Sequence, residues 1–430
     1  MIVLIIVALL LLAAMGAPLF ALLGAIALIG FHYAGQSGVA VAVEFYRLSD
    51  MPALIAIPLF TLAGYLLAES QTPRRLVRLT NVLFGWMPGG LAIVAVCACT
   101  LFTAFTGATG VTIIALGAVL YPALRQANYG ENFTLGLLTA SGSLGLLLVP
   151  SMPLILYGVV AQQFQTNPPV SIDALFRAGV LPCLLMVVLL GLYSAWHVRH
   201  VPRPPRATAA ELWAATRDAV WEIPLPFVIL AGIYSGKLAA SEAAAATALY
   251  VLIVTVLIRR EIPLRELPRV IRHAMILVGG ILVILGFSLA LTNWLIDAEV
   301  PDKLFQFLRT QIPEDRPLLF LLALNLFLLV FGMLLEGFPA IILLVPLVLP
   351  VALRYGVDPV HLGIIFLANL QLGIFFPPLG INLYIASARF RRPVMTLVRA
   401  AVPFFLIMFA ATLIITYSPY IWRALGFGAH

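Results

Sequence analysis

Runs of about 20 apolar residues recur along almost the whole chain, and each can cross the roughly 30 Å hydrocarbon core of a bilayer. Of the 430 residues, 63% are hydrophobic and 10% are charged, whereas soluble proteins have about 25% charged residues. The sequence therefore predicts an all-α polytopic membrane protein in a lipid bilayer. The runs lie at 2–14, 18–32, 51–69, 133–161, 178–197, 222–237, 242–258, 273–296, 360–388 and 400–418, with two further apolar segments at 86–124 and 317–353.

The net charge of +7 lies in short connections between the apolar runs. This distribution orients a membrane protein and does not indicate nucleic-acid binding. The N-terminal stretch MIVLIIVALLLLAAMG has no basic residues and continues into further apolar sequence, so we expect it to be retained rather than cleaved as a signal peptide.

The charges of the connections predict the orientation of the spans. Mixed connections at 162–177, 236–242 and 297–316 belong outside, and basic connections belong in the cytoplasm. The predicted side of the connections, basic inside and mixed outside, alternates without exception along the chain on one condition. Segment 86–124 must enter and leave the membrane on the cytoplasmic side, and segment 317–353 must enter and leave it on the outer side. The basic connections contain Arg74, Arg75 and Arg78; Arg199, Arg203 and Arg206; Arg259, Arg260, Arg265, Arg269 and Arg272; and Arg389, Arg391, Arg392 and Arg399.

A pair of complete spans would also return to the side from which it started, so length decides the interpretation of 86–124. Its two apolar arms, 91–105 and 111–124, have about 14 residues each, or roughly 21 Å of helix. That is less than the thickness of the membrane, and we therefore expect re-entrant hairpins.

The middle of the first hairpin, TGATG (106–110), has a counterpart in the second half of the chain. EGFPAIILLVPLVLP (336–350) is again a polar, glycine-containing break followed by an apolar arm, and LQLGIFFPPLGINLYIAS (370–387) matches SGSLGLLLVPSMPLILYG (141–158), with Gly373 aligned to Gly145. Irregular backbone at membrane depth is tolerated where it is buried or lines a cavity. The order and opposite orientation indicate inverted repeats with two broken helices, as in secondary transporters. Close helix packing with proline kinks is the alternative.

These breaks are the candidate site, because their freed carbonyls suit a hard cation and their helix N-termini suit an anion. Glu336 is the only charged residue between Arg316 and Arg354, and intramembrane carboxylates are usually functional. We expect sodium as the coupling ion and no other cofactor. The sodium ligands, mostly backbone carbonyls, are predicted at Thr106, Gly107, Thr109, Gly142, Gly145, Gly337, Gly373 and Pro377, and substrate contacts at Ser151, Glu336, Pro378 and Asn382.

Enzymatic function is not indicated. HExxH and GxSxG motifs are absent, and Leu238 follows Lys237 where a nucleotide-binding loop requires Ser or Thr. No catalytic residue is predicted. The stretches 207–221 and 301–312 are predicted to be amphipathic arms at the two membrane interfaces.

These motifs resemble the large membrane subunit of the tripartite ATP-independent periplasmic (TRAP) transporters, of the dicarboxylate-type family, over essentially the whole chain. The resemblance is carried by IPLFTLAGYLLAES (57–70), TGATG, GLLLVPSMPLILYG, LFRAGVLP (175–182), EGFPAIILLVPLVLP, GVDPVHLGIIFLANLQLG and PPLGINLYIAS. Ala108 and Thr109 stand where the family usually has two serines, and Val149 precedes Pro150 where a double proline is usual.

The resemblance implies an elevator-type, sodium-driven importer in the bacterial inner membrane. It also implies two partners, a small membrane subunit of about four helices and a periplasmic binding protein that delivers small carboxylates, such as sialic acid or dicarboxylates. The predicted domains are scaffold helices at 1–85, a first transport segment at 86–161, scaffold and arms at 162–316, a second transport segment at 317–388 and a C-terminal helix at 389–430. A stand-alone sodium-coupled dicarboxylate or anion carrier, a channel and a membrane scaffold are the alternative functions.

Overall fold

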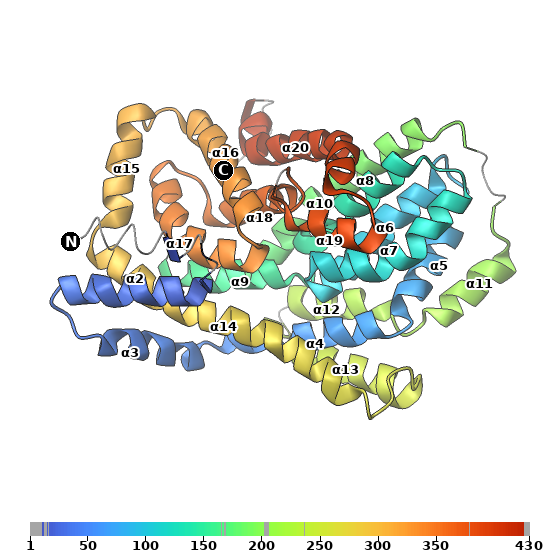
Figure 1. The fold of residues 1–430 in the computed structure, drawn as a ribbon, viewed down its shortest axis with the longest axis horizontal. Coiled ribbons are helices and arrows are strands. Elements are labelled where there is room, and N and C mark those ends of the chain that lie inside the picture. Colours follow the sequence, from blue (N-terminus) through green and yellow to red (C-terminus); the bar gives the residue numbers. More distant parts are fainter. Residues whose placement is uncertain are drawn as a thin grey trace.

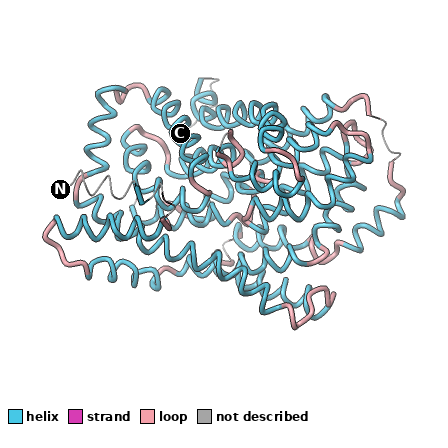
Figure 2. Tube along the Cα trace, viewed as in Figure 1, coloured by secondary structure: helices cyan, strands magenta, loops and turns pink. Residues whose placement is uncertain are grey.

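The computed structural model describes residues 11–12, 15, 17–164, 166, 169–201, 206–235, 237–377 and 379–424. Throughout these residues the chain forms helices joined by loops and contains no strand (Figure 2). The predicted all-α class is confirmed. Most of the first predicted run, 2–14, lies outside the described residues.

The helices follow the order of the apolar runs. Their bounds are α2 (Leu19–Tyr33), α3 (Val39–Arg47), α4 (Ala56–Glu69), α5 (Thr72–Phe84), α6 (Gly90–Thr106), α7 (Thr109–Gln126), α8 (Glu131–Ser141), α9 (Met152–Ala161), α10 (Ile172–His197), α11 (Ala209–Asp218), α12 (Pro224–Tyr234), α13 (Ala240–Leu252), α14 (Leu267–Asp297), α15 (Val300–Gln311), α16 (Pro317–Leu334), α17 (Gly337–Arg354), α18 (Pro359–Gly373), α19 (Ile381–Phe390) and α20 (Val394–Ala424). Short η segments occur at Leu48–Asp50, Pro52–Ile55, Leu144–Leu147 (η3), Gln162–Phe164 and Ile253–Ile258.

Seven of the described helices are long and apolar enough to cross a membrane, or eight if the bent pair Glu131–Leu147 and Met152–Phe164 counts as one span. The prediction of a span at 222–237 is not met, because α12 has only 11 residues, roughly 16 Å of helix. The hairpin helices α6 and α7 have 17 and 18 residues, which exceeds the expected arm length. At roughly 26 Å each they are still shorter than the hydrocarbon core.

The order of helices from α4 to α10 is repeated from α14 to α20. Equivalent positions in the two halves are 228 residues apart. This separation holds for the ends of α4 and α14, for the starts of α5 and α15, of α7 and α17 and of α8 and α18, and for Ser143 and Gln371. Gly145 and Gly373, which the sequence aligns, have the same separation. The two halves of the chain therefore fold into the same sequence of elements.

The predicted basic connection at 71–79 is helical. It forms most of α5, the counterpart of α15, and α5 is not among the described helices that could cross a membrane. The amphipathic helices predicted at 207–221 and 301–312 do form, as α11 and α15, and α11 packs against α5. The sequence shows three arginines here but not the carboxylates that allow one of them, Arg75, to be buried inside a helical packing interface.

The two halves interlock around the buried core. Each hairpin packs its first helix on the interrupted helix of its own half, α6 on η3 and α16 on α18. The second helices cross over, so that α7 packs on α19 and α17 on α9. In Figure 1 these elements occupy the centre of the molecule, and α2, α3, α4, α13 and α14 lie along the lower edge. This exchange brings residues from both halves to one place.

Candidate functional site

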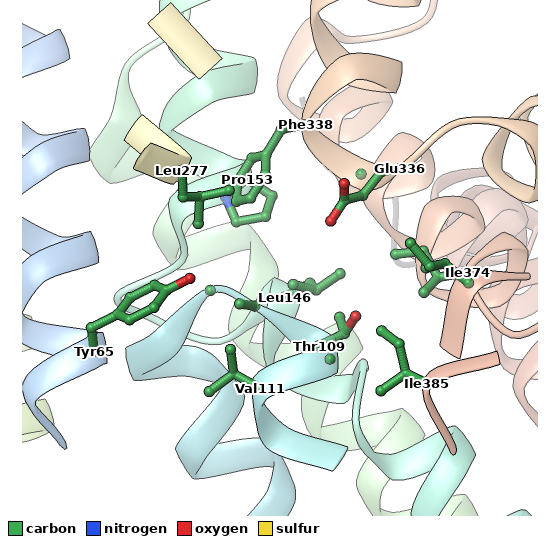
Figure 3. A pocket seen from close by; sticks show the side chains of 15 residues that line it. Tyr65, Thr109, Val111, Leu146, Pro153, Leu277, Glu336, Phe338, Ile374 and Ile385 are labelled. Carbon is green, nitrogen blue, oxygen red and sulfur yellow. The ribbon is translucent and has the colours of Figure 1, made fainter. Parts of the chain in front are cut away.

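A cavity of about 170 Å³ lies where the two hairpins meet. Figure 3 shows its walls, with Thr109 and Val111 from the first hairpin, Glu336 and Phe338 from the second, and Tyr65 opposite them on α4. Leu277 of α14 also lines it, so helices of the predicted scaffold close one side. The remaining lining residues are Gly107, Ala108, Gly110, Leu146, Pro153, Gly337, Ile374, Ile381 and Ile385.

The first hairpin turns in two residues, Gly107 and Ala108, between α6 and α7. Gly107 has φ +63°, and a Cβ there would lie 2.9 Å from Cγ of Met152. Glycine adopts this left-handed conformation without strain, which is why it ends so many helices. The turn leaves the N-terminus of α7 facing the cavity.

The second hairpin also turns in two residues, Leu335 and Glu336, before α17. Glu336 is the N-cap residue of α17, but its side chain caps no backbone amide. Its carboxylate makes no hydrogen bond or ion pair with the part of the chain that the structure describes. In Figure 3 the side chain points into the cavity, so a charged, unpaired acceptor faces the space where a ligand would bind.

Hydrogen bonds join the two halves next to this cavity. Thr109 at the first tip donates to Asn382 Oδ1 in α19, at 2.8 Å. At the breaks themselves, the Ser143 hydroxyl donates to the Gln371 carbonyl at 3.2 Å, and Gln371 Nε2 donates to the Leu144 carbonyl at 3.4 Å. Backbone carbonyls freed by the breaks thus have side-chain donors from the opposite half.

Each break also fits closely against its own hairpin. A Cβ at Gly145 would lie 2.3 Å from the Thr100 carbonyl oxygen in α6, and a Cβ at Gly373 would lie 2.4 Å from the Gly332 backbone in α16. Only glycine allows such a close approach of two backbones. The aligned glycines therefore occupy equivalent positions in the two halves.

The cavity is lined by only some of the predicted site residues, namely Gly107, Thr109, Glu336 and Gly337. Pro378 lies outside the described residues. The others are not among the lining residues: Thr106, Gly142, Gly145, Gly373, Pro377, Ser151 and Asn382.

Two of the predicted substrate contacts already have partners. The Ser151 hydroxyl is 1% exposed, donates to the Leu146 carbonyl and accepts from the Leu154 amide, so it caps α9. Asn382 is fully buried, and its Nδ2 has no hydrogen-bond partner among the described residues. Asn382 is therefore better placed than Ser151 to respond to a ligand at the first tip.

Sequence reasoning misses Tyr65. It belongs to the stretch 57–70 that carries part of the family resemblance, but as an aromatic residue in an apolar span it gives no sign of facing a site. The phenol oxygen has no partner among the described residues, and it points into the cavity in Figure 3. A polar tip in an otherwise apolar helix, one turn before Glu69, is the signal that could have identified it.

Many apolar helices, two helical hairpins and two interrupted helices that meet at one cavity define a multi-pass membrane transport protein. Its family follows from comparison. The chain belongs to the family described as the tripartite ATP-independent periplasmic transporter, DctM component, which matches residues 4–421. It is thus the large permease component of a TRAP transporter, which is a transport component and not an enzyme.

Similar proteins with assigned substrates share about a third of their residues with this chain. The C4-dicarboxylate TRAP transporter large permease protein DctM of Pseudomonas aeruginosa is 32% identical over 388 residues, covering 90% of this chain and 89% of that protein. The sialic acid large permease protein SiaM of Vibrio cholerae is 31% identical over 373 residues, covering 86% and 85%.

A solved structure supports the fold. The YdaH transporter of Alcanivorax borkumensis aligns with a TM-score of 0.61 at 17% identity, covering 90% of this chain and 88% of that chain. At this identity the likeness concerns the fold alone.

Proposed function

We propose that this chain is the permease of a sodium-coupled importer of small carboxylates in the bacterial inner membrane. The observation that carries the proposal is that residues of both hairpin tips and of the regions of both interrupted helices line the same cavity. Helix N-termini at such a point attract an anionic substrate, and backbone carbonyls released from helices coordinate a hard cation.

Sodium is the proposed coupling ion. The predicted ligands at Thr106, Gly107, Thr109, Gly142 and Gly145 belong to the first tip and break, and Gly337, Gly373 and Pro377 to the second. The test is uptake into proteoliposomes that contain the complete transporter. Uptake should require an inward sodium gradient, and equal uptake on a proton gradient in sodium-free buffer would contradict the proposal.

The two halves are proposed to be inverted repeats with re-entrant hairpins, and the transport segments 91–161 and 317–388 are proposed to move as one body. Support comes from the exchange of α7 and α17 between the halves, which ties the segments together, and from Tyr65 and Leu277, which bring scaffold helices to the same cavity. A fixed site would need two gates, whereas a site carried across as a rigid body, an elevator, needs only sliding surfaces.

Cross-linking tests this motion. Thr61 of α4 and Met152 of α9 approach to 3.9 Å between Oγ1 and Sδ. In a chain with Cys97, Cys99 and Cys183 replaced, cysteines at these two positions are bridged by Hg²⁺ or a short bifunctional thiol reagent. Complete bridging should stop transport and leave binding intact.

A bridge within one moving segment is the matched control. Thr103 and Thr112 lie 2.7 Å apart between their hydroxyl oxygens, both within the first hairpin. Bridging cysteines at this pair should leave more transport than bridging Thr61 to Met152. Unchanged transport in the fully bridged Thr61–Met152 variant would overturn the elevator mechanism.

The proposed partners are a small four-helix membrane subunit and a periplasmic binding protein. The relatives' names identify large permease components, which implies further subunits. The expected result is no uptake by the chain alone and uptake after both partners are added. Strong uptake by the chain alone would favour the stand-alone carrier.

A further inference from the structure

The two hairpin tips differ in the charge of the side chains that they place at the cavity. Thr109 is the polar side chain of the first tip, and it has no ionisable group. The second tip presents the Glu336 carboxylate. Among the described residues that line the cavity there is no lysine, arginine or histidine, so this carboxylate faces the ligand without a neutralising side chain.

The first tip is the better place for a substrate carboxylate. The amides of the first turn of a helix have no partner within the helix, and together they form a positive end. Thr109 and Gly110 begin α7 and line the cavity. A neutral tip with free amides is the usual arrangement for anion binding at a helix terminus.

The second tip is a poor place for another carboxylate. The Glu336 side chain stands at the N-cap of α17 and already places a negative charge beside that positive helix end. A second anion bound in this cavity would lie close to a like charge, and like charges repel. The site therefore opposes a ligand with a carboxylate at both ends.

The groups around the second tip suit a hydrogen-bond donor. Tyr65 and Glu336 both point into the cavity (Figure 3). Neither the phenol nor the carboxylate has a hydrogen-bond or ion-pair partner among the described residues. An ammonium, amidinium or hydroxyl group of a ligand could donate to the carboxylate, and such charge-assisted hydrogen bonds are the strong ones. The phenol oxygen of Tyr65 offers a second acceptor.

We infer that this site selects a carboxylate whose other end donates hydrogen bonds or is positively charged, in preference to a dicarboxylate. The carboxylate lies at the α7 N-terminus, and the donor lies between Glu336 and Tyr65. This inference rests on the proposed function and names its substrate class.

Three probes that differ only at one end test it. Succinate, 3-hydroxypropionate and β-alanine share a carboxylate and two methylene groups and end in carboxylate, hydroxyl and ammonium. Binding to the purified full-length chain in nanodiscs with sodium is measured by titration calorimetry. β-Alanine should bind about tenfold or more tightly than succinate, since the hydrogen bond to a charged group is lost in succinate, and 3-hydroxypropionate should lie between them.

Two variants place the preference on named residues. Glu336→Gln should remove the preference for β-alanine over succinate. Tyr65→Phe should weaken the binding of 3-hydroxypropionate and β-alanine and leave the affinity for succinate unchanged. Glu314→Gln is the matched control, because it removes a carboxylate from an exposed surface pair with Arg309. It should leave the order of the three probes unchanged.

Several results would overturn the inference. The first is that succinate binds most tightly of the three probes, and the second is that none of them binds. The third is that Glu336→Gln leaves the order of affinities unchanged. The fourth is that Glu336→Gln weakens the binding of all three probes equally and that added sodium restores it. The last result would assign Glu336 to the ion. Sodium-driven uptake by the complete transporter is measured separately, so the proposed function can stand when this inference fails.

Discussion

Helices α5 and α15, called here the first and the second arm, hold equivalent places in the two halves, 228 residues apart, yet they are fastened in different ways. They lie towards opposite ends of the longest axis of the molecule in Figure 1. Arg75 of α5 is 8% exposed and forms ion pairs with Glu222 and Glu261. Asp302 of α15 pairs with Arg354, and both side chains are about half exposed.

The two arms are also attached to different parts of the protein. The partners of α5, Glu222 and Glu261, belong to the connections before α12 and α14, within the predicted scaffold. Two hydrogen bonds add to this attachment: the backbone amide of Gln71 donates to Glu261 at 2.9 Å, and the Thr72 hydroxyl donates to Glu222 at 3.2 Å. The first arm is thus held on these two connections by largely buried charge.

The second arm is held on the hairpin that follows it. Besides the pair with Asp302, Arg354 lies over the ring of Phe305 at 4.9 Å from its centroid, and the Tyr355 hydroxyl donates to the Ile312 carbonyl at 2.7 Å. The same element of the two halves is thus fastened to different neighbours by a few side chains. Because the charges of the first attachment are largely shielded from water, removing one of them should cost more stability than removing one at the second attachment.

The largest effect is expected from Arg75→Met. It leaves the buried Glu222 and the 13% exposed Glu261 side chain without this counter-charge, which costs about 3–5 kcal/mol in unfolding free energy, measured as a fall in Tm or in folded yield. Arg78→Met is the matched control on the same helix, because Arg78 is 55% exposed and pairs with Asp218, and it should cost about 0–1 kcal/mol.

A further variant keeps this prediction testable if Arg75→Met does not fold. Combining it with Glu222→Gln and Glu261→Gln removes the unpaired charges and should restore part of the lost stability. Equal effects of Arg75→Met and Arg78→Met would show that α5 is not held by buried charge.

The next largest effect is the loss of stability on enlarging the glycine of either break, and it should be similar in the two halves. Gly145→Ala and Gly373→Ala force a Cβ against the backbone of α6 or α16, and overpacking of this kind costs about 1–3 kcal/mol. Gly279→Ala is the control, since a Cβ there has no neighbour within 4 Å, and alanine should be neutral or slightly stabilising in the helix interior. Thermal unfolding of the purified variants provides the measurement. A loss confined to one half would break the equivalence of the two breaks.

A smaller effect concerns a polar contact found in the second half. Asn369 of α18 donates to Asn325 Oδ1 of α16 at 2.6 Å, and Thr416 of α20 donates to the same oxygen at 3.0 Å. The positions 228 residues earlier are Cys97 and Ser141. A double-mutant cycle with Asn325→Ala and Asn369→Ala should give a coupling energy of about 0.6 kcal/mol, the average for buried polar pairs in a membrane protein. A coupling near zero would mean that this amide pair does not stabilise the second half.

The smallest effect on stability is expected from Arg354→Met. The ion pair that it removes is exposed, so the loss in unfolding free energy should be about 0–1 kcal/mol. Amide hydrogen exchange should rise in α15 and remain unchanged in α5. A rise in α5, or a stability loss as large as that of Arg75→Met, would remove the distinction between the arms.

Much of the fold follows from local patterns in the sequence. The apolar runs identify the membrane class. Glycine marks both hairpin tips, and glycine with proline marks both breaks, where the structure has them. The amphipathic stretches become α11 and α15. These predictions succeed because hydrophobic length and backbone-breaking residues act over a few residues and do not depend on distant partners.

The features that the sequence did not show concern packing. The segment 222–237 is apolar, but it forms the 11-residue helix α12. The arginines of 71–79 have the composition of a connection, yet Arg75 is buried because Glu222, 147 residues later, meets it. Hydropathy cannot distinguish a charged loop from a charged helix whose charges are neutralised by distant residues.

For the candidate site, the sequence by itself determined the two tips and the two breaks, since each is a local interruption of an apolar run. Tertiary structure alone decided that Tyr65 faces Glu336 across one cavity, and that Thr109 reaches Asn382, 273 residues away. Such meetings arise from the crossing of α7 and α17 between the halves. They depend on how many helices pack at once, which no short stretch of sequence encodes.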